Sequence, residues 1–459
     1  MKYIFLDYKT DSLLKVVQLR ILYILMRISL MLFSVKIPDS NKYIIGASFV
    51  NTYGDSLYYY SYLKLKAIKE NKKIIIICTT SNPAFDIIKC ILNKDEYIVY
   101  NNSVYNVILF FIQKKYARSS IDYVLMWAIR KKYTNMVLFT FDELLGRKEH
   151  YVNGLNQSST NKNKHIRCID NIIRHYKSFN FNFLLKRLDY YNLLEKNDIH
   201  NEFLNKFSDR YKEEFSSLKR RIGINKRYVC LHIKEYDFNL SAEQQPRGIK
   251  SPNNYISAIS YILTNGFQVV LLGKNKFRSI FIDESGFIDY QNSGFQSILN
   301  DLILINGCDF YIGNNSGPYD GAIMFKKPIM LINCVGINEH IPLHDKVRFF
   351  PKLFKKCSTG EIIDPFEQID RIESMTNQLN IEDQNGGIKL LELTSEEVLN
   401  SAKEMIDVVN SDSKKNRATE LQQIYFQKKM PHHLMLYISD SLPFNGYLLH
   451  SCINKMKKL

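Results

Sequence analysis

Short apolar runs alternate with longer amphipathic segments along most of the chain. In the first third this pattern predicts a strand at 43–49, a turn at 50–55, a helix at 56–69, a strand at 73–79, a helix from about residue 84, and an apolar run at 136–141. Regular alternation of strands and helices is typical of the α/β class with parallel sheets. We therefore expect an α/β fold.

A second series of the same kind begins at Tyr228. Its predicted elements are a strand at 228–234, a helix at 252–263, strands at 267–273 and 287–290, a helix at 295–305, an apolar strand from Cys308, a helix opening with Pro318, and a strand entered through Lys327-Pro328. An amphipathic helix follows at 395–408, with Thr394 or Ser395 as its cap. Two such series predict two Rossmann-like domains, with ligands in an interdomain cleft at the carboxyl ends of the strands.

The chain length agrees with more than one domain, because 459 residues exceed one ordinary core. The segment 145–225 turns polar and charged, and it is interpreted as the join between the domains. The predicted organisation is an amphipathic helix at 1–38, a Rossmann-like domain at 39–225, a second Rossmann-like domain at 226–410, and a helical tail at 411–459.

The segment 13–37 is long enough to cross a bilayer, but it is interrupted by Lys15, Arg20, Arg27 and Lys36. Charges at bilayer depth are costly, so a spanning helix fits poorly, and a signal peptide fits no better. Two interpretations stay open: a helix lying in the headgroup plane of a membrane, or a helix packed on the protein's own core. We expect a cytoplasmic protein, and the first interpretation places it peripherally on the inner face of the cytoplasmic membrane.

Charge and cysteine content narrow the function classes. The formal net charge of +16 favours acidic partners such as anionic lipid, nucleic acid or phosphorylated substrates, although the base composition of the gene can produce the same bias. No RNP-like or zinc-finger spacing is present, so no nucleic-acid partner is expected.

The eight cysteines form no C-x-x-C pair, and Cys78, Cys230 and Cys334 lie in apolar runs. This favours buried, reduced thiols and implies no metal site.

The most informative segment is the turn Asn314-Asn315-Ser316-Gly317, which joins an apolar strand to the helix that opens with Pro318. Small residues leave backbone N–H groups accessible at a helix N-terminus, where the partial positive charge favours an anion. The hydroxyl of Ser316 can add a donor, and a diphosphate is the expected ligand. The alternative is a strand-to-helix turn with a serine cap and no ligand.

Other candidates follow predicted strands. Asp55 can serve as the general base that accepts a proton from an acceptor hydroxyl, or it can cap the helix at 56–69. His232 and Lys234 occupy alternate positions of one strand and so share a face, which can meet donor phosphates or sugar. The alternative for His232 is a core histidine with a satisfied hydrogen bond.

Arg247 lies in a turn-like loop, where a guanidinium suits a diphosphate or a sugar carboxylate. Lys274 follows a strand end and can assist, or it can be an ordinary solvated lysine. Asp289 and Tyr290 can contact the base or ribose, and an ordinary strand-end aspartate is the alternative.

These motifs resemble known families. The segment 313–331 is similar to the donor-binding segment of bacterial GT-B glycosyltransferases of the heptosyltransferase type, which runs Asn/Asp-Ser-Gly-Pro, a small-residue helix, Lys-Pro and a strand. Those enzymes have a histidine two residues after the proline, where this chain has Asp320. The segment 48–57 resembles the Ser…Gly-Asp turn of the same family, in a longer form, and His232-x-Lys234 resembles a His-x-Arg pattern of GT-B fucosyltransferases.

Over most of residues 40–410 the chain also resembles a bacterial family of surface-polysaccharide glycosyltransferases. That likeness rests on the order and spacing of 231–235, Arg247, Asn254-Tyr255, Asp289-Tyr290 and Ser316-Gly317.

The resemblance implies a GT-B-like glycosyltransferase that moves a sugar from a nucleotide-sugar donor to a surface polysaccharide or lipid-linked glycan acceptor. No cofactor is expected, and the lack of a strand-end Asp-x-Asp favours metal-independent transfer. Two alternatives stay open: a carbohydrate- or nucleotide-binding protein without catalysis, and an enzyme similar to sugar-nucleotide epimerases. The missing Gly-x-Gly-x-x-Gly counts mildly against a dinucleotide enzyme.

The residue types and the resemblance together predict ten donor-binding residues. They are His232, Lys234, Arg247, Lys274, Asp289, Tyr290, Asn314, Asn315, Ser316 and Gly317.

Overall fold

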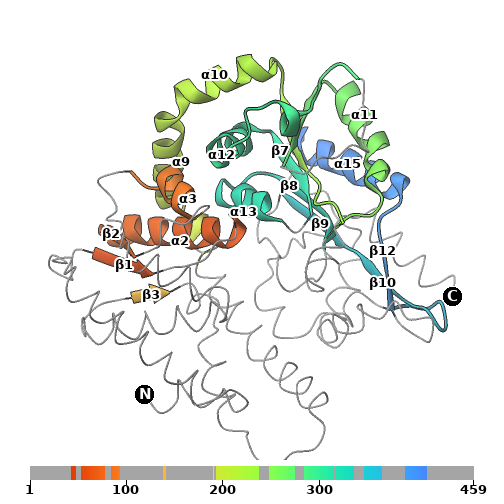
Figure 1. Cartoon of the computed structure of the whole chain (residues 1–459), viewed down its shortest axis with the longest axis horizontal. Helices are drawn as coiled ribbons and strands as arrows, with labels where there is room; N and C mark the ends of the chain where they lie inside the picture. The colour runs from red at the N-terminus through yellow and green to blue at the C-terminus, as the bar shows by residue number, and fades with distance from the viewer. Residues whose placement is uncertain are drawn as a thin grey trace, which may run out of the picture. The chain divides into compact units, whose positions relative to one another are not determined.

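The structure is a computed structural model of the chain (Figure 1). It describes residues 43–47, 53–77, 84–93, 138–140, 190, 193–236, 248–273, 284–314, 316–334, 346–363 and 388–410. The chain divides into two compact units, Met1–Phe203 and Leu204–Leu459, and the division falls within helix α9 (Asn197–Arg210). Each unit is described by itself.

Unit 1 contains a parallel three-stranded sheet. Its strands are β1 (Tyr43–Ala47), β2 (Lys73–Ile77) and β3 (Leu138–Thr140), in the order β2-β1-β3. Helix α2 (Tyr53–Glu70) connects β1 to β2, and α3 (Ala84–Ile91) follows β2, so the predicted strand–helix–strand series is confirmed. Helix α2 begins earlier than predicted, which places Gly54 and Asp55 in its first turn instead of in the preceding loop. Acidic residues are favoured in a first turn by the helix dipole.

Unit 2 is built on a six-stranded sheet in which every neighbouring pair is parallel. Its strands are β4 (Tyr228–His232), β5 (Gln268–Leu272), β6 (Phe287–Ile288), β7 (Phe310–Gly313), β8 (Ile329–Cys334) and β9 (Val347–Pro351), in the order β6-β5-β4-β7-β8-β9. Every residue of β4, β5, β7 and β8 is buried, as expected of parallel strands covered on both faces. Numbered within the unit, the order is 3-2-1-4-5-6, that of doubly wound Rossmann folds.

Helices cover both faces of this sheet. On one face, α11 (Ile256–Thr264) and α15 (Ser395–Asn410) pack with the strands in one apolar core that includes Ile259, Ile262 and Met405. Figure 1 shows α10 (Lys212–Ile222), α12 (Ile298–Gly307) and α13 (Gly317–Met324) on the other face. The remaining elements are two 3₁₀ turns, η4 (Pro252–Tyr255) and η5 (Tyr290–Asn292), and a small antiparallel sheet of β10 (Leu353–Lys356), β11 (Ile362–Ile363) and β12 (Ile388–Leu391).

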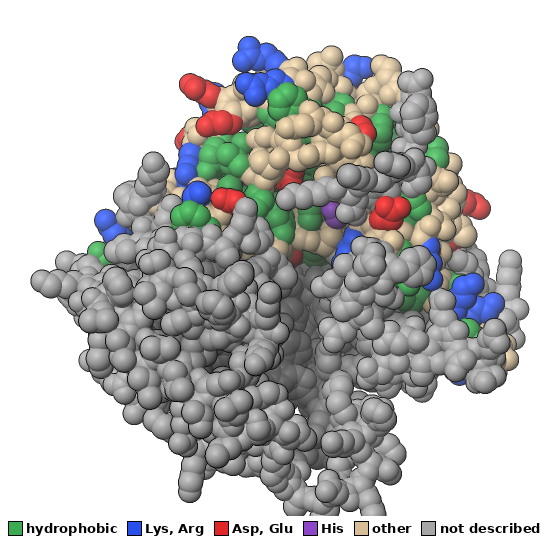
Figure 2. Space-filling view, in the orientation of Figure 1, with side chains coloured by type: hydrophobic (Ala, Val, Ile, Leu, Met, Phe, Trp, Pro, Cys, Tyr) green, Lys and Arg blue, Asp and Glu red, His purple; other side chains and the backbone are tan. Residues whose placement is uncertain are grey.

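Local chemistry explains where the helices begin and end. Thr394 and Glu397 form a reciprocal capping box at the start of α15: the Glu397 Oε2 accepts from Thr394 N at 2.9 Å, and Glu397 N donates to Thr394 Oγ1 at 3.3 Å. Thr394 is therefore the cap. Helix α10 carries acidic residues in its first turn and basic residues in its last, a separation visible in Figure 2, and it ends at Gly223 in the left-handed conformation with φ 80°.

Several sequence predictions lie outside the described residues: the amphipathic helix at 1–38, the tail at 411–459, and Cys78. In the part of the chain that the structure describes, Cys230 and Cys334 are buried free thiols, as predicted. No helix of that part has both the length and the apolar character needed to cross a bilayer.

Candidate functional site

The strand order of unit 2 has a switch point between β4 and β7. The chain leaves β4 towards α11 on one face of the sheet and reaches β7 from α12 on the other. In open α/β sheets, ligands bind in the crevice outside the carboxyl ends of the strands at such a point. His232 and Gly313 are register partners and are the last residues of β4 and β7, so a ligand site is expected directly beyond them.

Beyond this last pair, the side chain of Asn314 continues the connection between the two strands. Asn314 is completely buried, and its Oδ1 accepts from Lys234 N at 2.9 Å. Its Nδ2 donates to Lys234 O at 3.4 Å. The amide therefore satisfies both backbone groups of Lys234 at the place where the regular ladder ends.

Ser316 and His232 form a second connection across the switch point, with Ser316 Oγ 2.8 Å from His232 Nδ1. Ser316 occupies the N-cap position of α13, but its side chain makes no capping hydrogen bond. Ser297, the N-cap of α12, differs although its backbone is nearly the same: φ −155° and ψ 161°, against −153° and 163° at Ser316. The Ser297 hydroxyl accepts from Asn300 N at 3.0 Å.

The consequence is a helix N-terminus at the switch point that the Ser316 side chain does not cap. One alternative from the sequence was a turn in which Ser316 caps the helix and no ligand binds. The structure does not contain that cap, because the Ser316 hydroxyl bonds His232. First-turn N–H groups that lack a side-chain partner are a favourable place for an anion. Asp320 supplies one acidic group to the first turn of α13.

The imidazole of His232 is neutral near neutral pH. Burial, and then the positive charge of Lys234, lower the pKa of His232 from 6.5 to about 4. A neutral ring can accept at one nitrogen and donate at the other. The charge of the site is therefore carried by Lys234, and His232 contributes hydrogen bonding.

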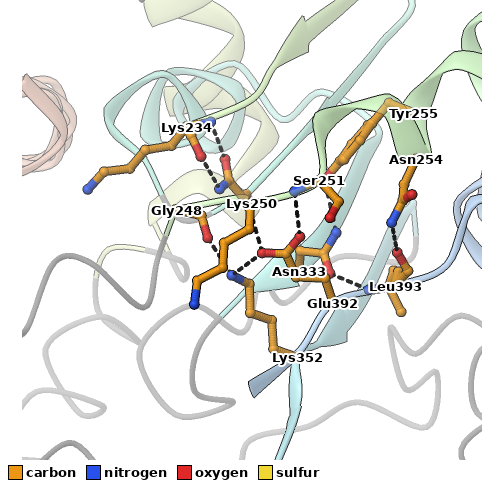
Figure 3. A network of polar contacts seen from close by, with 11 residues as sticks. Lys234, Gly248, Lys250, Ser251, Asn254, Tyr255, Asn333, Lys352, Glu392 and Leu393 are labelled. Carbon is orange, nitrogen blue, oxygen red and sulfur yellow. Dashed lines mark hydrogen bonds and ion pairs between the residues drawn. The ribbon is translucent and has the colours of Figure 1, made fainter. Parts of the chain in front are cut away.

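A polar network lies at the same edge of the sheet (Figure 3). Its centre is a buried ion pair, in which Lys352 Nζ lies 3.2 Å from Glu392 Oε1 and also donates to the carbonyl of Gly248. The same carboxylate accepts from Lys250 N at 2.7 Å and from Ser251 N at 3.0 Å. The pair therefore holds the backbone of 248–251 in place.

This segment runs beside the extension of β4. Ile249 N donates to Lys234 O at 2.8 Å, and Tyr236 N donates to Ile249 O at 3.0 Å. Gly248 is required here, because a Cβ at that position would lie 2.5 Å from Tyr236 Cα and 2.8 Å from Glu235 O.

Asn333, near the end of β8, extends the network by hydrogen bonds to two further segments of the chain. Its Oδ1 accepts from Leu393 N at 2.8 Å, and its Nδ2 donates to the Tyr255 hydroxyl at 3.1 Å. Asn333 of β8 and the segments that follow β4, β9 and β12 are therefore joined at one edge.

The structure gathers part of the predicted site. Five of the predicted residues lie together at the β4–β7 switch point: His232, Lys234, Asn314, Ser316 and Gly317.

The two residues after β6 are separate from this group. Asp289 is exposed and accepts from Asn292 Nδ2 at 2.6 Å. Tyr290 is completely buried and donates its hydroxyl to Phe295 O at 3.1 Å, so the structure assigns its ring to the core. Arg247, Lys274, Asn315 and the side chain of Asp55 lie outside the described residues. No group of His, Cys, Asp or Glu side chains able to hold a metal is present among the residues described.

Lys352, Glu392 and Asn333 were not predicted. The available signal was a single lysine in the apolar run 349–354 and an asparagine at the end of an apolar strand. A polar residue in such a position must find partners when it is buried.

The strand order defines unit 2 as a doubly wound α/β domain whose switch point lies between β4 and β7. No protein-family model matches the chain, and no curated protein sequence matches it. Several solved structures are similar to it, and they include heptosyltransferases, a family 9 glycosyl transferase and a wall teichoic acid polymerase.

Three of them are glycosyltransferases. The first is the iron-containing dodecameric glycosyltransferase TibC of enterotoxigenic E. coli H10407, with 13% identity and a TM-score of 0.30 over 63% of this chain. The second is a family 9 glycosyl transferase of Veillonella parvula DSM 2008, with 12% identity and a TM-score of 0.40 over 82% of this chain and 99% of the other. The third is ADP-heptose LPS heptosyltransferase II of E. coli, with 13% identity and a TM-score of 0.35 over 73% of this chain and 99% of the other. The match to TibC spans 57% of the TibC chain. These values assign no family membership.

Proposed function

We propose that the protein is a glycosyltransferase that takes a sugar from a nucleotide-sugar donor and binds the donor phosphates at the N-terminus of α13. The observation that carries this proposal is the Ser316–His232 hydrogen bond, which leaves α13 without a side-chain cap at the switch point of a 3-2-1-4-5-6 sheet. Nucleotide phosphates are the ligands that this arrangement suits best.

The chemistry of transfer fits these groups. An acceptor hydroxyl attacks the anomeric carbon, the bond from that carbon to the phosphate oxygen breaks, and the hydroxyl proton passes to a base. The leaving nucleoside diphosphate gains negative charge. The dipole of α13, the Ser316 hydroxyl and the Lys234 charge can stabilise that charge. Asp55 is the candidate base predicted from the sequence.

We further propose transfer without a metal, a surface polysaccharide or lipid-linked glycan as the acceptor, and a position on the inner face of the cytoplasmic membrane. The resemblance of the donor segment to polysaccharide-assembling enzymes supports the acceptor class. The cationic helix N-terminus and Lys234 support metal-independent release of the diphosphate.

Isothermal titration calorimetry tests the donor site. The full-length protein is titrated with UDP, GDP, ADP and CMP, with and without EDTA, beside the variants Ser316→Ala and Ser401→Ala. Ser401 is a matched control, because its buried hydroxyl donates to Glu397 O at 2.7 Å within α15. We expect one nucleotide to bind, Ser316→Ala to weaken it, and Ser401→Ala and EDTA to leave its affinity unchanged. Absence of binding to every nucleotide would remove the transferase proposal, and equal affinity of Ser316→Ala would move the phosphates elsewhere.

A further inference from the structure

Tyr311 is a residue near the donor site that the sequence motifs do not single out. It lies in the middle of β7 and is completely buried. Successive residues of a strand point to opposite faces, so Tyr311 shares a face with Gly313 and not with Phe310 or Ile312. Phe310 and Ile312 belong to the core under α11 and α15.

The ring of Tyr311 extends along the strand over Gly313. A Cβ built on Gly313 would lie 2.7 Å from the Tyr311 hydroxyl oxygen and 2.8 Å from Tyr311 Cε1. The phenol therefore occupies the space that a side chain at 313 would need. Its hydroxyl is carried to the carboxyl end of β7, beneath the turn that leads into α13.

The hydroxyl of Tyr311 is buried and makes no hydrogen bond of regular geometry among the described residues, although Ser316 lies close enough to interact with it. Burial raises the pKa of the Tyr311 phenol well above its ordinary value, and the neighbouring Ser316 hydroxyl opposes that rise, so the group is protonated. A buried donor left unpaired is costly, and native proteins rarely keep one without a reason.

The neighbouring Ser316 can complete the arrangement. A serine oxygen has two lone pairs and one proton. It can accept from Tyr311 and from His232 Nδ1–H together, and it then has its own proton left to donate. His232 already lies 2.8 Å from that oxygen.

We propose that Tyr311 is a positioning residue of the anion site: its hydroxyl donates to Ser316 Oγ when the site is occupied, and Ser316 turns its own proton to the phosphate. This role rests on the proposed function, since it assumes a phosphate ligand at the N-terminus of α13. Tyr311 does not touch the ligand and acts through Ser316.

The variant Tyr311→Phe tests this role, because it removes one oxygen atom and keeps the ring. Tyr228→Phe is the matched control, since the buried Tyr228 hydroxyl does have a partner and donates to Leu304 O at 2.7 Å. Affinity for the bound nucleotide, for pyrophosphate as a minimal probe, and the Tm of the free protein are measured for the full-length chain.

We expect Tyr311→Phe to bind roughly five- to tenfold more weakly, with an unchanged or higher Tm, because the oxygen that it removes is unpaired in the free protein. We expect the control to show the reverse: a lower Tm and unchanged affinity. A merely structural role of Tyr311 would lower the Tm and spare the affinity.

A double-mutant cycle with Ser316→Ala completes the test. If Tyr311 acts through Ser316, then Tyr311→Phe has no further effect on affinity in the Ser316→Ala background. Wild-type affinity of Tyr311→Phe, or the same loss in both backgrounds, overturns the role of Tyr311 while the proposed function stands. Absence of nucleotide and pyrophosphate binding by the wild-type protein overturns both.

Discussion

Ser316 Oγ lies 2.8 Å from His232 Nδ1, so a hydroxyl at the start of one helix is bonded to a ring at the end of a neighbouring strand. The bond joins two residues that are remote in sequence and adjacent only because β4 pairs with β7. It also removes the serine from the capping role that its backbone would allow. The candidate donor site therefore depends on Ser316 bonding His232 instead of capping α13.

The two N-cap serines give a matched prediction. We expect Ser297→Asp and Ser316→Asp both to fold, because aspartate is a favourable N-cap residue. Only Ser316→Asp places a carboxylate where a phosphate is proposed to bind, so we expect it to weaken nucleotide binding by about tenfold or more. Calorimetry of both variants checks this. Equal affinity of the two variants would show that the phosphates bind away from α13.

The neutral state of His232 predicts a pH dependence of stability. The pKa of His232 is lowered to about 4 by burial first and the charge of Lys234 second. As the pH falls below about 6.5, the unfolded chain binds a proton at this residue that the folded protein does not bind. Its contribution is therefore fully present above pH 6.5 and decreases progressively towards pH 4, by up to about 3 kcal/mol.

The variant His232→Gln isolates this contribution from that of the other histidines. The free energy of unfolding is measured in urea for both proteins at several pH values between about 4.5 and 7.5. We expect the variant to gain stability relative to the wild type as the pH falls. A difference that is constant with pH would contradict the buried, neutral imidazole.

The hydrogen bonds of Asn314 predict that the variant Asn314→Ala is less stable than the wild type. Asn314→Ala removes both bonds to the Lys234 backbone. Lys234 O still accepts from Ile249 N, so the main loss is the acceptor for Lys234 N, with an expected cost of about 1–3 kcal/mol. Asn306→Ala is the control, because Asn306 is only partly buried and its Nδ2 donates to Ser208 Oγ in an exposed hydrogen bond. Urea unfolding should separate the two variants clearly. A wild-type midpoint for Asn314→Ala would mean that the bridge between the strands is dispensable.

The ion pair between Lys352 and Glu392 predicts that variants of the two residues have strongly non-additive effects on the free energy of unfolding. Lys352→Met or Glu392→Met alone leaves an uncompensated charge, so each should lower the free energy of unfolding by about 3–5 kcal/mol. The double variant should cost less than the sum of the two. In contrast, Lys356→Met should have little effect, because Lys356 and Glu361 form an exposed pair at 2.6 Å.

Additive effects at Lys352 and Glu392 would argue against their direct pairing. The same variants also test the position of segment 248–251, since Lys352 and Glu392 bind its backbone. Weaker nucleotide binding by a Lys352→Met protein that is still folded is the expected result.

The local pattern of residues was sufficient to predict the strands and helices around the site. The apolar run that became β4 is buried along its whole length, and the small-residue turn after β7 leads into a helix as predicted. The prediction failed at boundaries: α2 begins at Tyr53, and the expected strand at 287–290 ends at Ile288, where a 3₁₀ turn takes over. Element ends depend on single capping and turn contacts, which periodicity does not contain.

The partners of the site residues could not be predicted, because they depend on strand order. That Ser316 would bond His232 follows from the pairing of β4 with β7, and nothing near either residue in the sequence specifies that pairing. The ion pair between Lys352 and Glu392 was even harder to predict, because it requires β9, β10 and β12 to meet at one edge. Long-range order of this kind is a property of the whole sheet.

The close approach of Tyr311 to Gly313 has a consequence for the history of this chain. The ring of Tyr311 occupies the space beside Gly313, so position 313 cannot take a larger residue while that ring is present. Among descendants of a common ancestor, an aromatic residue at 311 and a glycine at 313 should be inherited together, and a lineage that acquires a larger residue at 313 should first have lost the ring at 311. Substitution at 313 is thus open only to chains that have already given up the phenol.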